Sequence, residues 1–415
     1  MRHLLGIFLL YCGIFFTPIL SVASPVAMRI HGPLHTSGMR IVDNEGNIVV
    51  FRGVNVSGME WGAGTPWGKG CHDPQWGIRY GCYASPKSDV YDQVANWGFN
   101  VVRIPISWAN LEPAPGKINE EYLTALDAII HEFGKRDIAV ILSMHQWDWS
   151  ANFTAPKWKG GKRIHGNGEA VWLYPESWFA KNPITHGPVD NKITGQQLAS
   201  QEFFINRPKP MLKGEKIQQH LIELWAIVAQ RYRGFSNIVA ADIFNEPYSN
   251  QKNQLEDFYI RAARRIHEID PRLLLVFEVS LSTHRLRGKY ILDSPDFPQD
   301  KGVYAVHIYM GTAKKAISKI GKALEAARLW SVPLWIGEFH CITRHDPSSR
   351  FGFHVDSQQS QQLLDFMKKY GDGGNGITDI SWTYWAYQKD AQPLDGKNDR
   401  PPANMELVNR LQHGF

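Results

Sequence analysis

The feature that most constrains this chain is a repeated alternation of short apolar runs with helical patterns. Eight runs, rich in β-branched and aromatic residues, have the length and composition of buried strands. They cover residues 49–55, 99–106, 138–145, 239–244, 273–279, 302–309, 333–339 and 379–387. Amphipathic stretches that fit helices separate most of them, at 88–97, 120–136, 216–232, 254–269, 314–330 and 357–370.

Near-continuous apolar strands that alternate with helices are typical of a parallel sheet covered by helices. Eight such units close into a barrel, so the sequence predicts an α/β fold, a (β/α)8 TIM barrel. The alternative is a doubly wound open sheet. That fold needs a glycine-rich phosphate-binding turn after an early strand, and the sequence has none.

Two additions to the barrel are expected. Residues 29–53 predict a small N-terminal β-hairpin, with a turn signal at 43–46. Residues 146–214 separate the third strand from its helix, far more than the usual two to six or so residues. This long loop contains several tryptophans but no repeated helix or strand pattern, so we expect a cleft wall rather than a second domain.

Composition excludes some classes of protein. Hydrophobic residues make up 43% of the chain and charged residues 20%, so a folded globular protein is expected. The formal net charge is only +5, and no basic run interleaves with aromatic residues, so nucleic acid is not expected as a partner. Tryptophan is the outlier, with 15 residues. Most tryptophans are core residues, but in a cleft their flat rings also stack on ligands.

The N-terminus has the pattern of a signal peptide over residues 1–23. Arg2 and His3 precede an apolar run at 4–20, and the small residues at 21–23 fit a cleavage site. The alternative is a membrane anchor, but the run is short for a span and contains two glycines and a proline. We therefore expect a secreted or periplasmic protein without stable membrane association after cleavage.

Three cysteines follow the predicted signal peptide. In an exported chain, Cys71 and Cys82 are placed to close a loop disulfide, which would leave Cys341 over. The spacing does not match a paired CxxC metal site, so no structural zinc is expected.

Polar and aromatic residues close many of the apolar runs, where the carboxyl ends of barrel strands share one face. Alone, each has a structural explanation: Asn245 and Glu246 before Pro247 could cap a helix, and Arg103 could form a barrel salt bridge. Taken together, they predict a site on that face. The candidates are Arg103, His145, Asn245, Glu246, His307, Tyr309, Glu338 and Trp385, with Trp382 as a nearby competitor of Trp385.

Glu246 and Glu338 are the informative pair, because they follow the fourth and seventh strands and should face each other across the barrel mouth. Burying unpaired carboxylates is costly, so a structural role for both is improbable. Two carboxyl groups in different environments can divide the roles of acid and nucleophile. A retaining glycosidase places such a pair about 5–5.5 Å apart.

Several short motifs resemble those of glycoside hydrolase family 5, the cellulase and mannanase family. They are VVRIPISW, ILSMH, IFNEPYS, HIY and WIGEF, in this order. The segment LHTSGMRIVDNEGNIVVFRGVN is similar to the N-terminal hairpin and first strand of the bacterial endoglucanases in that family. The resemblance covers nearly all of the mature chain. It implies one retaining (β/α)8 catalytic domain over residues 29–415, without a cofactor or a catalytic metal.

The resemblance also implies roles for the candidate residues. Glu246 is similar to the acid/base and should have a raised pKa, and Glu338 is similar to the nucleophile. The other matches are Arg103 and Tyr309 for holding the nucleophile ionised, His145 and Asn245 for binding the sugar at the scissile bond, His307 for partnering the acid/base, and Trp385 for stacking.

The function expected from this resemblance is an endo-β-1,4-glucanase that acts, as a monomer, on a β-linked polysaccharide or oligosaccharide. Mannan, xyloglucan, β-1,3-glucan and a glycolipid headgroup stay open as substrates. A non-catalytic carbohydrate-binding barrel is the alternative from another class, but both glutamates are present. A metal-dependent hydrolase using His145 and His307 would need clustered ligands, and the two histidines come singly from different strands.

Overall fold

The computed structural model describes residues 30, 32–61, 86, 88–147, 149–150, 167–181, 195–249, 253–280, 286–340, 342–345, 353–371, 380–387 and 411. The predicted signal peptide and the three cysteines of the predicted mature chain lie outside these residues, so export and the disulfide stay predictions. Within the described part of the chain, no helix combines the length and apolar character needed to cross a membrane.

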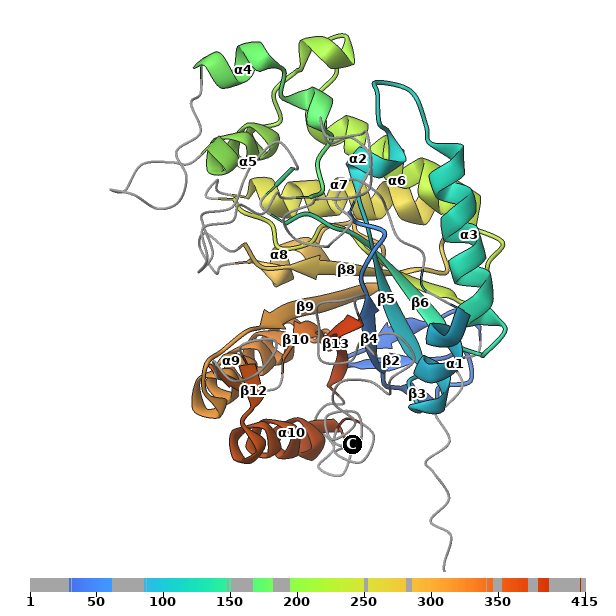
Figure 1. Cartoon of the computed structure of the whole chain (residues 1–415), viewed down its shortest axis with the longest axis vertical. Coiled ribbons are helices and arrows are strands. Elements are labelled where there is room, and N and C mark those ends of the chain that lie inside the picture. Colours follow the sequence, from blue (N-terminus) through green and yellow to red (C-terminus); the bar gives the residue numbers. More distant parts are fainter. Residues whose placement is uncertain are drawn as a thin grey trace, which may run out of the picture.

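Eight parallel strands form a closed barrel in the order β10–β13–β4–β5–β6–β7–β8–β9, which confirms the predicted fold (Figure 1). Their bounds are β4 (Arg52–Val56), β5 (Val101–Ile106), β6 (Ala139–Met144), β7 (Ile238–Asp242), β8 (Leu274–Glu278), β9 (Gly302–Ile308), β10 (Leu334–Phe339) and β13 (Ser381–Tyr387). Each strand lies inside its predicted run or extends one residue beyond it. Strands with apolar side chains on both faces suit this position between a packed interior and a ring of helices.

The helices between strands are α1 (Ser88–Asn96), α2 (Trp108–Leu111), α3 (Glu120–Gly134), α6 (Ile217–Tyr232), α7 (Gln254–Ile269), α8 (Gly288–Leu292), α9 (Ala313–Trp330) and α10 (Ser357–Gly371). Side-chain caps fix some starts: Asn119 accepts a hydrogen bond from the amide of Tyr122, and Thr312 accepts one from Lys315. The sequence did not predict α8, which is too short to show a helical period. It also did not predict the ribbon of β11 (Thr343–His345) and β12 (Phe353–Val355).

The N-terminal hairpin is present as part of a three-stranded antiparallel sheet of β1 (His35–Ser37), β2 (Arg40–Val42) and β3 (Ile48–Val49). Its turn forms because the Asp43 carboxylate accepts the amides of Glu45 and Asn47 at 2.9 and 2.8 Å. Apolar residues of this segment, including Ile41 and Phe51, share a core cluster with barrel residues such as Val101.

The inserted segment between β6 and α6 differs from the expectation of a loop without helices. Its described part contains η1 (Val171–Leu173), α4 (Glu176–Lys181), α5 (Gly195–Ile205) and η2 (Pro210–Leu212). Helix α5 packs on α7 (Figure 1). The ring of Phe203, on α5, stacks on that of Phe244 with centroids 5.4 Å apart. The few apolar residues of α5, among polar neighbours, give too short a pattern to reveal a helix.

A cluster of three buried or half-buried residues, Glu112, His220 and Glu215, fastens this segment to the barrel; we call it the His220 cluster. The Glu112 carboxylate accepts from His220 Nε2 at 2.9 Å, and His220 Nδ1 lies 2.8 Å from Glu215. The indole of Trp172, on η1, donates to the backbone carbonyl of Glu112 at 2.9 Å. Burial lowers the pKa of His220, but its hydrogen bonds to the two glutamates outweigh this and raise it.

Candidate active site

The seventh barrel strand turns Glu338 into the barrel mouth through a local irregularity. The pairing of β10 with β9 shifts register between Ile336 and Glu338, with Gly337 between them. A side chain at Gly337 would place its Cβ 3.0 Å from His307 Nε2, so the close approach favours glycine. Such irregularities re-aim side chains next to functional sites.

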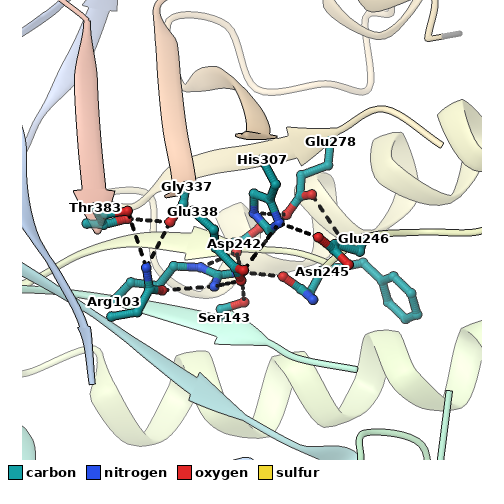
Figure 2. A network of polar contacts seen from close by, with 12 residues as sticks. Arg103, Ser143, Asp242, Asn245, Glu246, Glu278, His307, Gly337, Glu338 and Thr383 are labelled. Carbon is teal, nitrogen blue, oxygen red and sulfur yellow. Dashed lines mark hydrogen bonds and ion pairs between the residues drawn. The ribbon is translucent and has the colours of Figure 1, made fainter. Parts of the chain in front are cut away.

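Glu338 is held by one cation and one hydroxyl. Arg103 Nη1 lies 2.6 Å from Glu338 Oε1, and the Tyr309 hydroxyl donates to Oε2 at 2.5 Å. Arg103 is fully buried and also donates to Asp242 and Asn245, at 2.7 and 2.6 Å (Figure 2). A guanidinium stays protonated under all ordinary conditions, so this carboxylate has a permanent countercharge.

Glu246 has a different environment. Its Oε1 lies 2.8 Å from His307 Nδ1, and its backbone has a φ of 45°, the left-handed region that non-glycine residues seldom adopt. Gln146 supports this turn by donating its side-chain amide to the Glu246 carbonyl at 2.8 Å. The countercharge of Glu246 is therefore a titratable imidazole instead of a guanidinium.

A third carboxylate, Glu278, completes the group, and the sequence reasoning missed it. Glu278 ends β8 and is buried; its Oε2 accepts the amide of Glu246 at 3.3 Å, and its Oε1 lies 3.4 Å from His307 Nε2 (Figure 2). A glutamate inside the apolar run LLLVFEV was a visible signal, because a buried carboxylate needs a partner. Asp242, a carboxylate inside the apolar run of the fourth strand, gave the same signal.

The electrostatics correct one expectation, because the pKa of Glu246 is lowered and not raised. Burial raises that pKa, but the hydrogen bond from His307 and the charges of His307, Arg103 and Lys319 outweigh it. Burial lowers the pKa of His307, yet the charges of Glu278, Glu338 and Glu246 raise it to about 9. Burial raises the pKa of Glu278 to about 8. The imidazole of His307 therefore favours the ionised form of Glu246.

The remaining candidates lie beside this group. His145 is buried, its Nδ1 has no hydrogen-bond partner among the described residues, and burial lowers its pKa well below the usual value. The ring of Trp385 stacks on His145, with centroids 5.5 Å apart and planes at 10°. Trp382, its competitor, is buried in the core against Phe339. The Asn245 amide is oriented by Arg103 and by the Gln146 carbonyl, to which it donates at 2.9 Å.

Glu246, His307 and Glu338 each offer a donor atom, and these atoms lie within 4.8 Å of one another. A metal ion could bridge that spacing, but the local charges oppose it. Arg103 already lies 2.6 Å from Glu338, and a His307 pKa of about 9 keeps both ring nitrogens protonated near neutral pH. The donor set fits proton transfer better than metal binding.

A (β/α)8 barrel with paired glutamates at its mouth, one beside an arginine and a tyrosine, defines the class of carboxylate-dependent barrel hydrolases. A family model described as Cellulase (glycosyl hydrolase family 5) matches residues 42–390. The chain therefore belongs to glycosyl hydrolase family 5 and is a glycoside hydrolase, as its motifs indicated.

The chain is 25% identical over 252 residues to a glucosylceramidase of Rhizopus delemar, covering 54% of this chain and 36% of that protein. It is 22% identical over 284 residues to an endoglucanase of Paenibacillus polymyxa, covering 63% of this chain and 53% of that protein. The matched parts thus span roughly a third to a half of these curated relatives. A crystal structure of an endogalactoceramidase is similar in fold, with a TM-score of 0.65, 22% identity, and coverage of 86% of this chain and 75% of that chain.

Proposed function

We propose that the protein is a retaining β-glycosidase that works by double displacement, with Glu338 as nucleophile and Glu246 as acid/base. The observation that carries this is the closeness of the two carboxylates, which offer oxygens within 4.8 Å of each other. Retaining enzymes hold their carboxyl groups about 5–5.5 Å apart, whereas inverting enzymes leave about 6.5–9.5 Å for a water molecule.

In the first step, Glu338 Oε2 or Oε1 attacks the anomeric carbon while Glu246 gives a proton to the leaving oxygen. The glycosidic bond breaks and a glycosyl ester forms on Glu338. In the second step, Glu246 takes a proton from water, and the resulting hydroxide displaces Glu338 from the sugar. Arg103 and Tyr309 keep Glu338 oriented.

For the substrate, β-1,4-linked glucan is our first candidate, supported by the family motifs and by the endoglucanase of P. polymyxa among the relatives. A glycolipid headgroup is the second candidate. The observations in its favour are the glucosylceramidase of R. delemar and the fold similarity to an endogalactoceramidase. Both candidates present a β-linked sugar to the same pair of glutamates, so the mechanism is common to them.

The mechanism is tested by two variants. We expect Glu338→Gln to lose about 10⁴-fold or more in kcat on aryl β-glycosides, as happens when a covalent nucleophile is removed. Glu246→Ala should retain more activity on substrates with good leaving groups than on polysaccharide, and azide should restore part of it as the glycosyl azide. Unchanged turnover by Glu338→Gln, or uniform loss without azide rescue in Glu246→Ala, would contradict the assignments.

The substrate is decided by a panel on the purified protein. Carboxymethyl cellulose, mannan, xyloglucan and β-1,3-glucan are compared with glucosylceramide and lactosylceramide in detergent micelles, with product lengths measured in each case. Short oligosaccharides from cellulose would support the first candidate. Release of free ceramide with no reaction on any polysaccharide would replace it by the second.

A further inference from the structure

His340 lies one residue beyond the end of β10 and two residues beyond Glu338, and the family motifs give it no role. Phe339, between them, is buried in the core, where its ring packs edge-on against Trp382. His340 instead contacts two residues of the barrel mouth, Tyr309 and Trp385. It therefore connects the end of β10 with the ends of both neighbouring strands, β9 and β13.

The first contact supports the hydroxyl that holds the nucleophile. The ring of His340 packs edge-on against that of Tyr309, with centroids 4.9 Å apart and planes at 88°. Tyr309 is 41% exposed, although its hydroxyl donates to Glu338 Oε2 at 2.5 Å. In the described part of the chain, His340 supplies the only aromatic ring that packs on this phenol. Such packing restricts the rotation of the Tyr309 side chain and keeps its hydroxyl at the carboxylate.

The second contact holds the aromatic platform. His340 Nε2 is buried and has no hydrogen-bond partner among the described residues, so the ring nitrogen that hydrogen-bonds the Trp385 backbone is Nδ1. The indole of Trp385 in turn stacks on His145, with centroids 5.5 Å apart. Burial lowers the pKa of His340 to about 4, so the ring is neutral near neutral pH. His340 therefore acts by packing and by one hydrogen bond, and adds no charge beside Glu338.

We propose that His340 is a positioning residue, which fixes the phenol of Tyr309 against the nucleophile and the indole of Trp385 against the sugar. The inference rests on the proposed function, in which Glu338 is the nucleophile of a glycosidase. It adds to that function a residue that acts through its neighbours and not on the reacting atoms. One side chain then links the sugar platform to the group that orients Glu338.

The two contacts should affect different kinetic constants. The hydroxyl of Tyr309 orients Glu338 during its attack, and a catalytic group displaced by about 1 Å can cost about 10²-fold in rate. Loss of the ring contact should therefore lower kcat. The platform of Trp385 binds the sugar in the ground state and the transition state alike, so a looser platform should raise KM and leave kcat nearly unchanged.

Two variants of His340 separate these contacts. His340→Phe keeps an aromatic ring against Tyr309 but cannot hydrogen-bond the Trp385 backbone. His340→Asn has no ring, but its amide takes the place of Nδ1. On an aryl β-glycoside, we expect His340→Phe to raise KM about threefold or more at nearly unchanged kcat, and His340→Asn to lower kcat about tenfold or more with a smaller change in KM.

His220→Gln is the matched control, because it also removes a histidine that packs edge-on against an aromatic ring. That ring belongs to Trp172, with centroids 6.2 Å apart and planes at 88°, and it lies outside the site. The variant should keep both kcat and KM near the wild-type values. Selective changes in the His340 variants would then reflect the place of His340 and not the general loss of a packed histidine.

A double-mutant cycle tests whether His340 acts through Tyr309. Tyr309→Phe removes the hydroxyl, so adding His340→Asn should then cost little in kcat. Residues that act through one shared contact give non-additive effects, whereas independent losses add. Additive losses in kcat overturn the proposal, and so does a Tyr309→Phe variant with wild-type kcat, because no hydroxyl would then need to be positioned.

Equal changes in His340→Phe and His340→Asn would also overturn the proposal, because a purely structural residue does not separate KM from kcat. If His340→Asn does not fold, His340→Phe decides: a raised KM at unchanged kcat supports the proposal, and a lowered kcat at unchanged KM contradicts it. The proposed function fails by a different result, which is unchanged turnover by Glu338→Gln. The two failures are therefore distinguishable.

Discussion

The described part of the chain contains two glutamate–histidine–glutamate groups, which differ in whether both ring nitrogens of the histidine are hydrogen-bonded. In the His220 cluster, both ring nitrogens are bonded, at 2.8 Å to Glu215 and 2.9 Å to Glu112. In the second group, the His307 chain of Glu246, His307 and Glu278, Nδ1 lies 2.8 Å from Glu246 but Nε2 lies 3.4 Å from Glu278. Glu215 is 37% exposed, whereas Glu278 is only 4% exposed.

The second difference lies in the surroundings. The His307 chain faces Glu338 at 3.6 Å and shares its carboxylates with the buried guanidinium of Arg103, which comes within 4.0 Å of Glu278. The His220 cluster instead fastens Trp172 and the inserted segment to the barrel. The same two residue types therefore stabilise the fold where both ring nitrogens are hydrogen-bonded. Where one buried ring nitrogen has no hydrogen bond, the group instead faces the paired glutamates of the site.

The largest expected effect is a difference in kcat/KM between variants of His307 and of His220. We expect His307→Gln to lower kcat/KM on polysaccharide by about 10²–10⁴-fold, the usual contribution of acid–base catalysis, because Gln can hydrogen-bond Glu246 but puts no charged imidazole beside it. His220→Gln should leave kcat/KM nearly unchanged, because its cluster lies at the end of α2 and the start of α6 and touches neither Glu246 nor Glu338. Kinetics of both purified variants check this, and equal losses would remove the distinction between the groups.

The sequence predicted the strands and helices of the repeated βα unit and the polar residues at the ends of its strands. The eight strands and their long helices follow from hydrophobic period alone, and the paired glutamates follow from position at the ends of the fourth and seventh strands. Arg103, His307 and Tyr309 contact the two glutamates as expected. These features depend on local pattern and on the geometry that any closed parallel barrel imposes.

What could not be predicted depends on contacts between distant segments. The interpretation of Glu246 as a group with a raised pKa was wrong, because it counted the burial and the neighbouring anion but not the charged imidazole of His307. Glu278 was missed because it lies inside an apolar run instead of after it. Helix α5 is stabilised by contacts of its Phe203 with Phe244 and Phe258, which come after the insertion in the sequence.

A smaller effect should show that the His220 cluster stabilises the fold. The pKa of His220 is raised in the folded protein above its unfolded value of about 6.5. Its stabilisation is therefore complete below that pH and is lost as the pH rises through the folded pKa. We expect His220→Gln to lower the free energy of unfolding by about 1.5–3 kcal/mol at acidic pH, the usual contribution of a hydrogen bond to a charged group, and by less at alkaline pH. Urea unfolding across the pH range measures this, and a difference that does not change with pH would contradict it.

The smallest effect concerns Lys319, whose ammonium donates to the His307 carbonyl at 2.6 Å. Its positive charge is one of the causes that lower the pKa of Glu246, so Lys319→Met should raise that pKa. The alkaline limb of kcat/KM should then move slightly to higher pH, because Glu246 as the acid would keep its proton up to a higher pH. Lys322→Met, an exposed position on the same helix, is the control and should not move the limb. An unchanged alkaline limb in Lys319→Met, or a shift to lower pH, would mean that the charge of Lys319 does not act on the acid group.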